Sequence, residues 1–143
     1  MTKTVSLDQQ RQCEIIAQYW SYNLTLRKEW DEKKTRARRE ANEKRSKVRK
    51  LQGRLDALGP SPMTVPRGPA DALAAIAAAA AMTIRRGQLE NQLSVAGREL
   101  VEKEREFQRA EEQWAQFDRL VRESVNKWNA NGCEEVSSRP AAF

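Results

Sequence analysis

Two long runs of regularly spaced apolar residues, separated by one proline-rich segment, constrain most strongly how this chain can fold. Four of the five prolines lie close together, in Gly59-Pro60-Ser61-Pro62 and Pro66-Arg67-Gly68-Pro69. Because proline lacks an amide donor and clashes with the preceding helical turn, no helix crosses this segment. We therefore predict one helix over about residues 7–58, a Pro/Gly loop over 59–69 and a second helix over about 70–130.

Each predicted helix carries a seam in which steps of three and four residues alternate without a slip. The seam of the first helix comprises Cys13, Ile16, Trp20, Asn23, Arg27, Trp30, Lys34, Ala37, Ala41, Lys44, Val48, Leu51, Leu55 and Leu58. The seam of the second comprises Met82, Arg86, Leu89, Leu93, Ala96, Leu100, Lys103, Phe107, Ala110, Trp114, Phe117, Val121, Ser124 and Trp128. Such spacing is typical of helices that wind around each other. It predicts an all-α fold, two long helices forming an antiparallel coiled-coil hairpin, with two amphipathic helices of a larger bundle as the alternative.

The larger apolar side chains of the two runs should fill the hairpin seam. These are Ile16, Trp20, Trp30, Val48, Leu51, Leu55, Leu89, Leu93, Leu100, Phe107, Trp114, Phe117 and Val121. If the loop folds the second helix directly back on the first, Trp20 faces Ala110. This register sets large side chains against small ones, as interdigitated packing requires.

The predicted register contains two weak places. Lys44 would meet Arg86, and two like charges there would destabilise the middle of the hairpin. Trp128 would lie beyond the end of the covered seam, and an uncovered Trp marks a contact site for a partner. The alternative is that Trp128 folds back onto Val5 and Leu7.

The ends of the chain follow from capping residues. Ser6 is a plausible N-cap for the first helix, which makes residues 1–6 an N-terminal tail. Asn131-Gly132 is a fitting stop for the second helix. We expect residues 7–130 to form a single helical domain and residues 131–143 to be a flexible C-terminal tail.

The cysteines and the apolar runs bear on the compartment. Cys13 and Cys133 stand at opposite ends of the chain, without a C-x-x-C motif, so we expect neither a zinc site nor a disulfide scaffold. This favours a reduced, cytoplasmic setting. Residues 1–10 are polar, so we expect no signal peptide. The run over 72–82 is too short to cross a membrane and, being almost all alanine, predicts helix.

The charge of the chain is uneven. The net charge is +6, and residues 33–54 hold eleven Lys or Arg against two Glu. One interpretation is a solvated helix face with interhelical ion pairs, another a surface for an acidic protein partner, and a third nucleic acid bound without sequence preference. The partner-binding residues that we predict are Arg36, Arg38, Arg39, Lys47, Arg49, Lys50 and Trp128.

Catalytic patterns are missing from the sequence. Histidine is absent, which removes the commonest general base and metal ligand. There is no P-loop, no G-x-G-x-x-G and no His-based triad, and carboxylates on an exposed helix have no cleft to shift their pKa values. We therefore expect a protein that is not an enzyme, has no cofactor or metal and takes no small-molecule substrate.

The second helix resembles a known family. Leu89-Glu90-Asn91-Gln92-Leu93, Glu102-Lys103-Glu104-Arg105-Glu106-Phe107-Gln108 and Trp114 resemble the C-terminal arm of the type III secretion stalk proteins, the FliJ, YscO, HrpO and SpaM-like coiled-coil proteins. The resemblance covers about residues 7–130 and implies a stalk that links a hexameric secretion ATPase to the membrane export gate and contacts export chaperones. The Pro/Gly loop and the run over 74–81 depart from the family.

Two other classes stay open beside the stalk. One is another structural or chaperone-like coiled-coil protein, and the other is a basic helical hairpin that binds nucleic acid. A homodimer of hairpins would cover a second apolar stripe formed by Ile15, Tyr19, Tyr22 and Leu26. The location implied by the stalk is cytoplasmic and peripheral to the inner membrane, without insertion into it.

Overall fold

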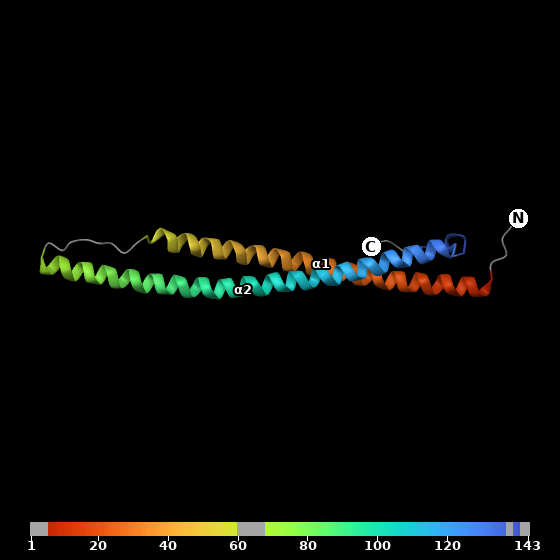
Figure 1. The fold of residues 1–143 in the computed structure, drawn as a ribbon, viewed down its shortest axis with the longest axis horizontal. Helices are drawn as coiled ribbons and strands as arrows, with labels where there is room; N and C mark the ends of the chain where they lie inside the picture. The colour runs from red at the N-terminus through yellow and green to blue at the C-terminus, as the bar shows by residue number, and fades with distance from the viewer. Residues whose placement is uncertain (1–5, 60–67, 137–138, 141–143) are drawn as a thin grey trace. The chain divides into compact units, whose positions relative to one another are not determined.

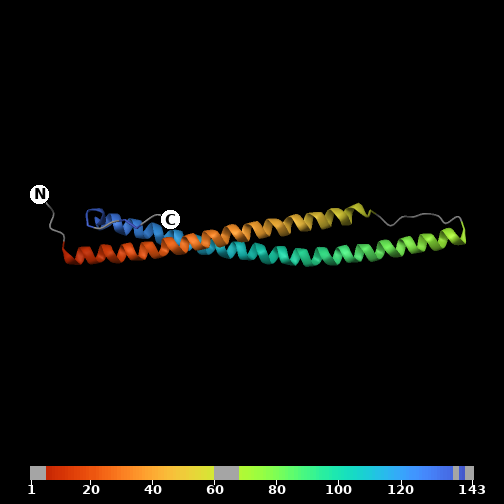
Figure 2. The ribbon, with the colours of Figure 1, turned by 180° about the vertical axis from the view of Figure 1, so that it is seen from behind.

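Two long helices make up almost all of the described chain. The structure, a computed structural model, describes residues 6–59, 68–136 and 139–140. Helix α1 spans Leu7–Ala57, helix α2 spans Pro69–Ala130, and the short 3₁₀ helix η1 spans Cys133–Glu135. The two long helices run antiparallel and pack against each other (Figures 1 and 2). The predicted all-α helical hairpin is confirmed.

The helix ends are set by the capping residues that the sequence indicated. The backbone N–H of Gln9 donates to the Ser6 hydroxyl over 3.1 Å, so Ser6 is the N-cap of α1. Gly59 and Gly132, which follow α1 and α2, both have φ near +60°. Only glycine adopts this left-handed backbone without a steric penalty, which explains why the helices end there. Most of the predicted N-terminal tail and loop, residues 1–5 and 60–67, lies outside the described residues.

The hairpin divides into two compact units. One unit consists of Met1–Arg38 with Glu106–Phe143, and we call it the terminal unit; the other is Arg39–Arg105, the loop unit. Each unit contains a stretch of α1 and the stretch of α2 that packs on it. Their cores are built from different residues, and each is described by itself.

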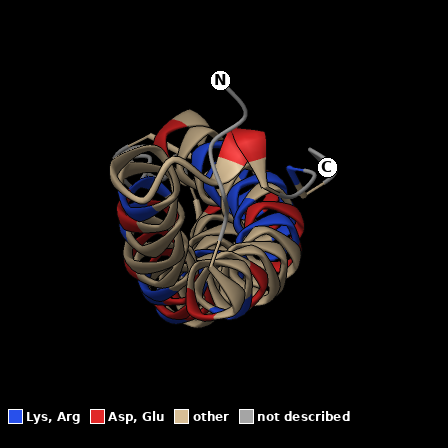
Figure 3. Cartoon of the chain, turned by 90° about the vertical axis from the view of Figure 1, so that its right-hand side faces the viewer, with Lys and Arg blue, Asp and Glu red and all other residues tan. Residues whose placement is uncertain are grey.

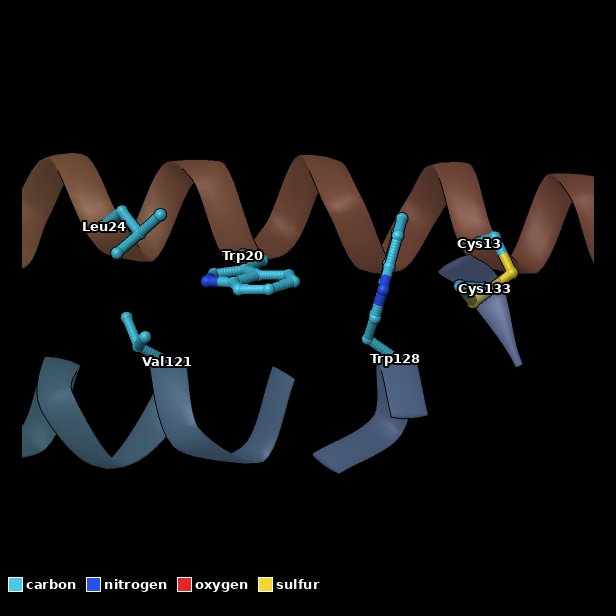
Figure 4. Packing of buried hydrophobic residues seen from close by; sticks show 6 residues of the cluster. All are labelled: Cys13, Trp20, Leu24, Val121, Trp128 and Cys133. Carbon is cyan, nitrogen blue, oxygen red and sulfur yellow. A yellow bond between two sulfur atoms is a disulfide. The ribbon is translucent and has the colours of Figure 1, made fainter. Parts of the chain in front are cut away.

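The terminal unit is held together by aromatic packing and a disulfide. Trp20 on α1 and Trp128 on α2 meet edge to face, with ring centroids 5.7 Å apart and an interplanar angle of 69° (Figure 4). Cys13 and Cys133 form a disulfide beside them, with Cα atoms 5.5 Å apart. Both sulfur-bearing side chains and Trp128 are fully buried. Leu24 and Val121 complete the cluster.

Three expectations about this end of the chain are wrong. Trp128, expected to be uncovered, has an exposure of 0%. The expectation that the cysteines form no disulfide is overturned by the Cys13–Cys133 bond. The tail after Gly132 is not flexible throughout, because Cys133 is buried and begins η1. The first error follows from the predicted register. The other two arise because Cys133 lies far from Cys13 in the sequence and beyond the stop of the second helix.

The true register is displaced along α2. Trp20 packs against Trp128 and not against Ala110, which places its partner 18 residues farther along the chain. That is about five helical turns. The predicted register pairs the second helix with the first from its first turn onward. In the structure α1 ends at Ala57 while its end lies near Arg86, whose guanidinium donates to the carbonyl oxygen of Gly59.

The loop unit has a thinner apolar seam. Its buried cluster consists of Leu51, Leu89 and Ala96, and Val48, Leu55, Leu58 and Leu93 pack against it. Ala41 is also buried. Ion pairs between the helices flank this seam. Lys44 and Arg86 do not meet as predicted, because the Lys44 ammonium lies 2.6 Å from the Glu99 carboxylate. The expected repulsion is therefore replaced by attraction.

Candidate partner-binding surface

The cations of α1 in the loop unit fall into two sets. Lys44 pairs with Glu99 at 2.6 Å, and Arg45 pairs with Glu104 at 3.1 Å. The hydrogen bond from Lys44, and then its charge, hold the pKa of Glu99 below its ordinary value, with a smaller contribution from the charge of Lys47. Lys44 and Arg45 thus serve the contact between α1 and α2.

The second set of cations lines a groove between the helices. Lys47, Lys50 and Arg54 stand three and four residues apart on α1, so they share one face of the helix with Leu51. From α2, Asn91, Gln92 and Val95 form the other wall. The groove has a volume of about 480 Å³. Its character is cationic at the rim and partly apolar at the floor.

A second groove adjoins the first. It has a volume of about 610 Å³ and is lined by Arg54, Ala81, Ile84, Arg85, Gln88, Leu89 and Gln92. Arg54 and Gln92 line both grooves, and we refer to the two together as the basic groove. Four cations, Lys47, Lys50, Arg54 and Arg85, line it, and no acidic side chain does. The arrangement can hold carboxylates and apolar groups without covalent chemistry.

The predicted partner-binding residues are placed differently by the structure. Lys47 and Lys50 line the basic groove. Arg36, Arg38, Arg39 and Arg49 are exposed on α1 and do not line it. Trp128 is buried in the terminal unit, so its side chain is not available to a partner.

Sequence reasoning missed two cations of the groove, Arg54 and Arg85. Arg54 follows Lys47 and Lys50 at helical spacing, and this i, i+3, i+7 pattern could have identified it. Arg85 comes from α2, and only the correct register brings it beside Arg54. The sequence-based prediction does not separate the cations of the basic stretch from one another. In the structure, Lys44 and Arg45 form ion pairs with acidic side chains of the second helix.

All predicted seam residues lie on inward-facing parts of the helices. Trp20, Leu51, Leu89 and Val121 are buried. The half-buried ones are Ile16, Trp30, Val48, Leu55, Leu93, Leu100, Phe107, Trp114 and Phe117. Two of these aromatic rings are contacted by a lysine. The ammonium of Lys33 lies 4.2 Å from the ring centre of Trp30, and the ammonium of Lys34 lies 4.2 Å from the ring centre of Trp114. Such cation–π contacts cover the edges of the seam.

Charged residues of both signs occur on both long helices. Figure 3, a view from one end, shows blue Lys and Arg segments and red Asp and Glu segments around the molecule. Among the described residues, no three or more His, Cys, Asp or Glu side chains gather as they would around a metal ion. No helix in the described part is both long enough and apolar enough to span a bilayer. We take the basic groove as the candidate partner-binding surface because of its cationic lining.

Comparisons of the chain with protein-family models, with curated proteins and with solved structures found no match. The likeness to secretion stalk proteins accordingly stays a prediction. Testing this prediction requires partner-binding experiments, and the basic groove is the candidate surface for them.

Proposed function

We propose that this chain is a non-catalytic coiled-coil scaffold that works by binding other proteins, and that it holds an acidic partner in the basic groove. One observation carries the proposal: four cations line this groove without any acidic side chain among its lining residues. An anionic partner would neutralise these positive charges, as groups of opposite charge do across protein interfaces. The groove walls add apolar contacts from Leu51, Ile84 and Val95.

The resemblance of the second helix gives this proposal a specific form. The scaffold is a stalk of a type III secretion system, and it connects the hexameric secretion ATPase with the export gate, with export chaperones as further partners. The two-helix hairpin is compatible with such a stalk. In this form, an acidic surface of the ATPase or of the gate occupies the basic groove.

The stalk proposal places the chain in the cytoplasm, attached to the inner membrane through the secretion complex. Thiols are kept reduced there, whereas the structure joins Cys13 to Cys133. Trapping the thiols with an alkylating agent during cell lysis decides the matter. A fully alkylated dithiol supports the cytoplasmic placement, and a disulfide that resists alkylation contradicts it and argues for an oxidising compartment.

The partner itself is tested by reversing the charge of the groove. In a pull-down of the secretion ATPase and the gate protein, the triple variant Lys47→Glu, Lys50→Glu, Arg54→Glu should capture at least about tenfold less partner, since close charge pairs across interfaces carry a few kcal/mol. Its circular dichroism should be unchanged, because none of the three side chains is buried in the seam. Nuclease treatment of the lysate removes bridging by nucleic acid, which a basic chain attracts.

A matched control is available on the second helix. Arg105, Arg109 and Arg119 are exposed, and changing all three to Glu alters the net charge by the same amount without touching the groove. This control should capture partner as the wild type does. The variant Arg36→Glu, Arg38→Glu, Arg39→Glu tests the sequence-based choice, and it should lose less than the groove variant. Undiminished capture by the groove variant, or equal loss in the control, would count against the proposal.

A further inference from the structure

One face of α2 exposes large apolar side chains where a water-soluble surface would carry polar ones. Leu73 is 69% exposed, Ile76 66% and Ile84 63%, and Val95 farther along is 41% exposed. Alanines fill most of the positions between Leu73 and Ile84. Contiguous exposed apolar surface of this kind marks an interaction site.

These side chains form one stripe that leads into the basic groove. Leu73, Ala77, Ala80 and Ile84 follow each other in steps of four, three and four residues, which keeps them on one side of the helix. The same steps continue through Gln88 and end at Val95, at positions that line the groove. We call residues 73–95 of this face the α2 stripe.

Helix α1 does not extend along the first part of the stripe. It ends at Ala57, and Gly59 just after it accepts a hydrogen bond from Arg86 of α2. From there toward Pro69, α2 continues beyond the end of α1 in both views (Figures 1 and 2). The stripe covers about 23 residues, or roughly 34 Å of helix.

We propose that the α2 stripe, together with the basic groove, docks a single amphipathic helix of a partner protein, with acidic side chains along the edge that faces Lys47, Lys50, Arg54 and Arg85. The inference rests on the proposed function and gives the acidic partner its form. The apolar side chains of that helix recur in steps of four and three residues along its whole length, and they pack on the stripe from Leu73 through Ile84 to Val95. Its carboxylates meet the cations of the groove.

Charge selects this occupant over a second copy of the chain. The chain carries a net charge of +6, and two copies that brought their basic grooves together would juxtapose the same cations. A lipid surface is the other apolar and anionic candidate. The part of the stripe nearest Val95 lies beside α1, which forms a second wall there. A groove with two walls fits a helix better than it fits a flat bilayer.

The test uses synthetic peptides and the full-length chain. Probe one is a peptide of about 23 residues that is labelled for fluorescence anisotropy. Its Leu residues repeat at i, i+4 and i+7 along the whole peptide, and its Glu residues lie along one flank of the helix. Probe two has the same composition in an order that scatters the leucines around the helix. Probe one should bind at least about tenfold more tightly and should gain helical circular dichroism on binding.

Two matched variants locate the binding site. Ile84→Asp should weaken probe one at least about tenfold, since it places a charge in the apolar stripe. Ile15→Asp makes the same change on α1 in the terminal unit, at a side chain that is 65% exposed against 63% for Ile84. It should leave binding unchanged. Leu73→Asp gives a second reading of the stripe, independent of Ile84.

Several outcomes would overturn the inference. Equal affinity for both probes would show that charge alone drives binding, which leaves the proposed acidic partner in place and removes the helix docking. An unchanged affinity of Ile84→Asp and Leu73→Asp would do the same. Light scattering that shows a dimer lost in Ile84→Asp would make a second copy the occupant, and flotation with anionic vesicles that requires Ile84 would make it a membrane. If neither probe binds and the groove variant also captures partner normally, the proposed function fails as well.

Discussion

The two units of the hairpin use the same pair of helices and hold them together by different means. In the terminal unit, two tryptophans, a buried disulfide and the fully buried side chains of Asn23 and Ser124 fix one position of α1 on α2. In the loop unit, four small or aliphatic residues are buried, and Lys44–Glu99, Arg45–Glu104 and Lys103–Glu40 bridge the helices at the surface.

This difference shows how binding and stability are distributed in a two-helix protein. Large rings and a covalent bond have one good geometry, whereas long charged side chains adapt to small shifts at little cost. The candidate partner-binding surface lies in the loop unit, where the seam is thin. The docking of a partner helix that we propose would be easier on a unit whose helix packing is less tightly specified.

The largest effect should come from truncating Trp128. Trp128→Ala removes the biggest fully buried side chain and should lower the free energy of unfolding by about 3–5 kcal/mol. Leu89→Ala in the loop unit should cost less, about 2–3 kcal/mol, because Leu89 is smaller and not completely buried. Urea denaturation followed by circular dichroism measures both.

Trp128→Phe is the matched control for this comparison. The indole N–H of Trp128 is buried without a hydrogen-bond partner in the described part of the chain. Replacing the ring with Phe therefore sacrifices area but no hydrogen bond, and should cost only about 1–2 kcal/mol. If Leu89→Ala proved as damaging as Trp128→Ala, the two units would not differ as we describe.

Reducing the disulfide should have the next largest effect. A bond between residues 13 and 133 restricts the unfolded chain over most of its length, so its loss should lower the free energy of unfolding by about 2–4 kcal/mol. Urea denaturation with and without a phosphine reductant measures this. Cys13→Ser should start from the lower stability and show no response to the reductant. A reductant effect that persisted in Cys13→Ser would contradict the assignment.

The smallest effect should come from the Glu99 ion pair, and it should depend on pH. Lys44 holds the pKa of Glu99 below 4.5 in the folded chain, so the unfolded chain binds the proton more readily. The pair's stabilisation is then present above pH 4.5 and is lost as the pH falls through the lowered pKa. Glu99→Gln should be slightly less stable than the wild type at pH 7 and equal to it once Glu99 is protonated.

Periodicity and capping residues suffice to predict the elements of this fold. The alternation of three and four residues identifies both helices, because only a helical period keeps these side chains on one face. Ser6, Gly59, Pro69 and Gly132 mark the ends within about two residues, since each has a backbone or capping property that few other residues share.

The register could not be predicted from the same pattern. A heptad seam repeats itself, so α2 can slide along α1 by whole turns and still place apolar residues in the interface. The residues that select one position are Trp128 and Cys133, and their partners are Trp20 and Cys13. In the register predicted from the loop, Cys133 has no counterpart on the first helix, and its separation in sequence from Cys13 gives no reason to pair the two.

For the same reason, the sequence predicts only part of the candidate site. Lys47 and Lys50 follow from the basic composition of α1 alone. Arg85, Ile84 and Val95 belong to the groove only after α2 has been placed correctly. The α2 stripe also cannot be predicted from the sequence. A run of alanines has high helix propensity, but it does not indicate which face of the helix will be covered.

The Cys13–Cys133 bond also gives the chain the topology of a closed ring. Between the two half-cystines lie 119 residues. A single backbone cut at any peptide bond within that span leaves one covalent molecule, and the two pieces separate only after reduction. Both arms therefore stay at high effective concentration with respect to each other after nicking, and a cleaved molecule can keep its paired helices.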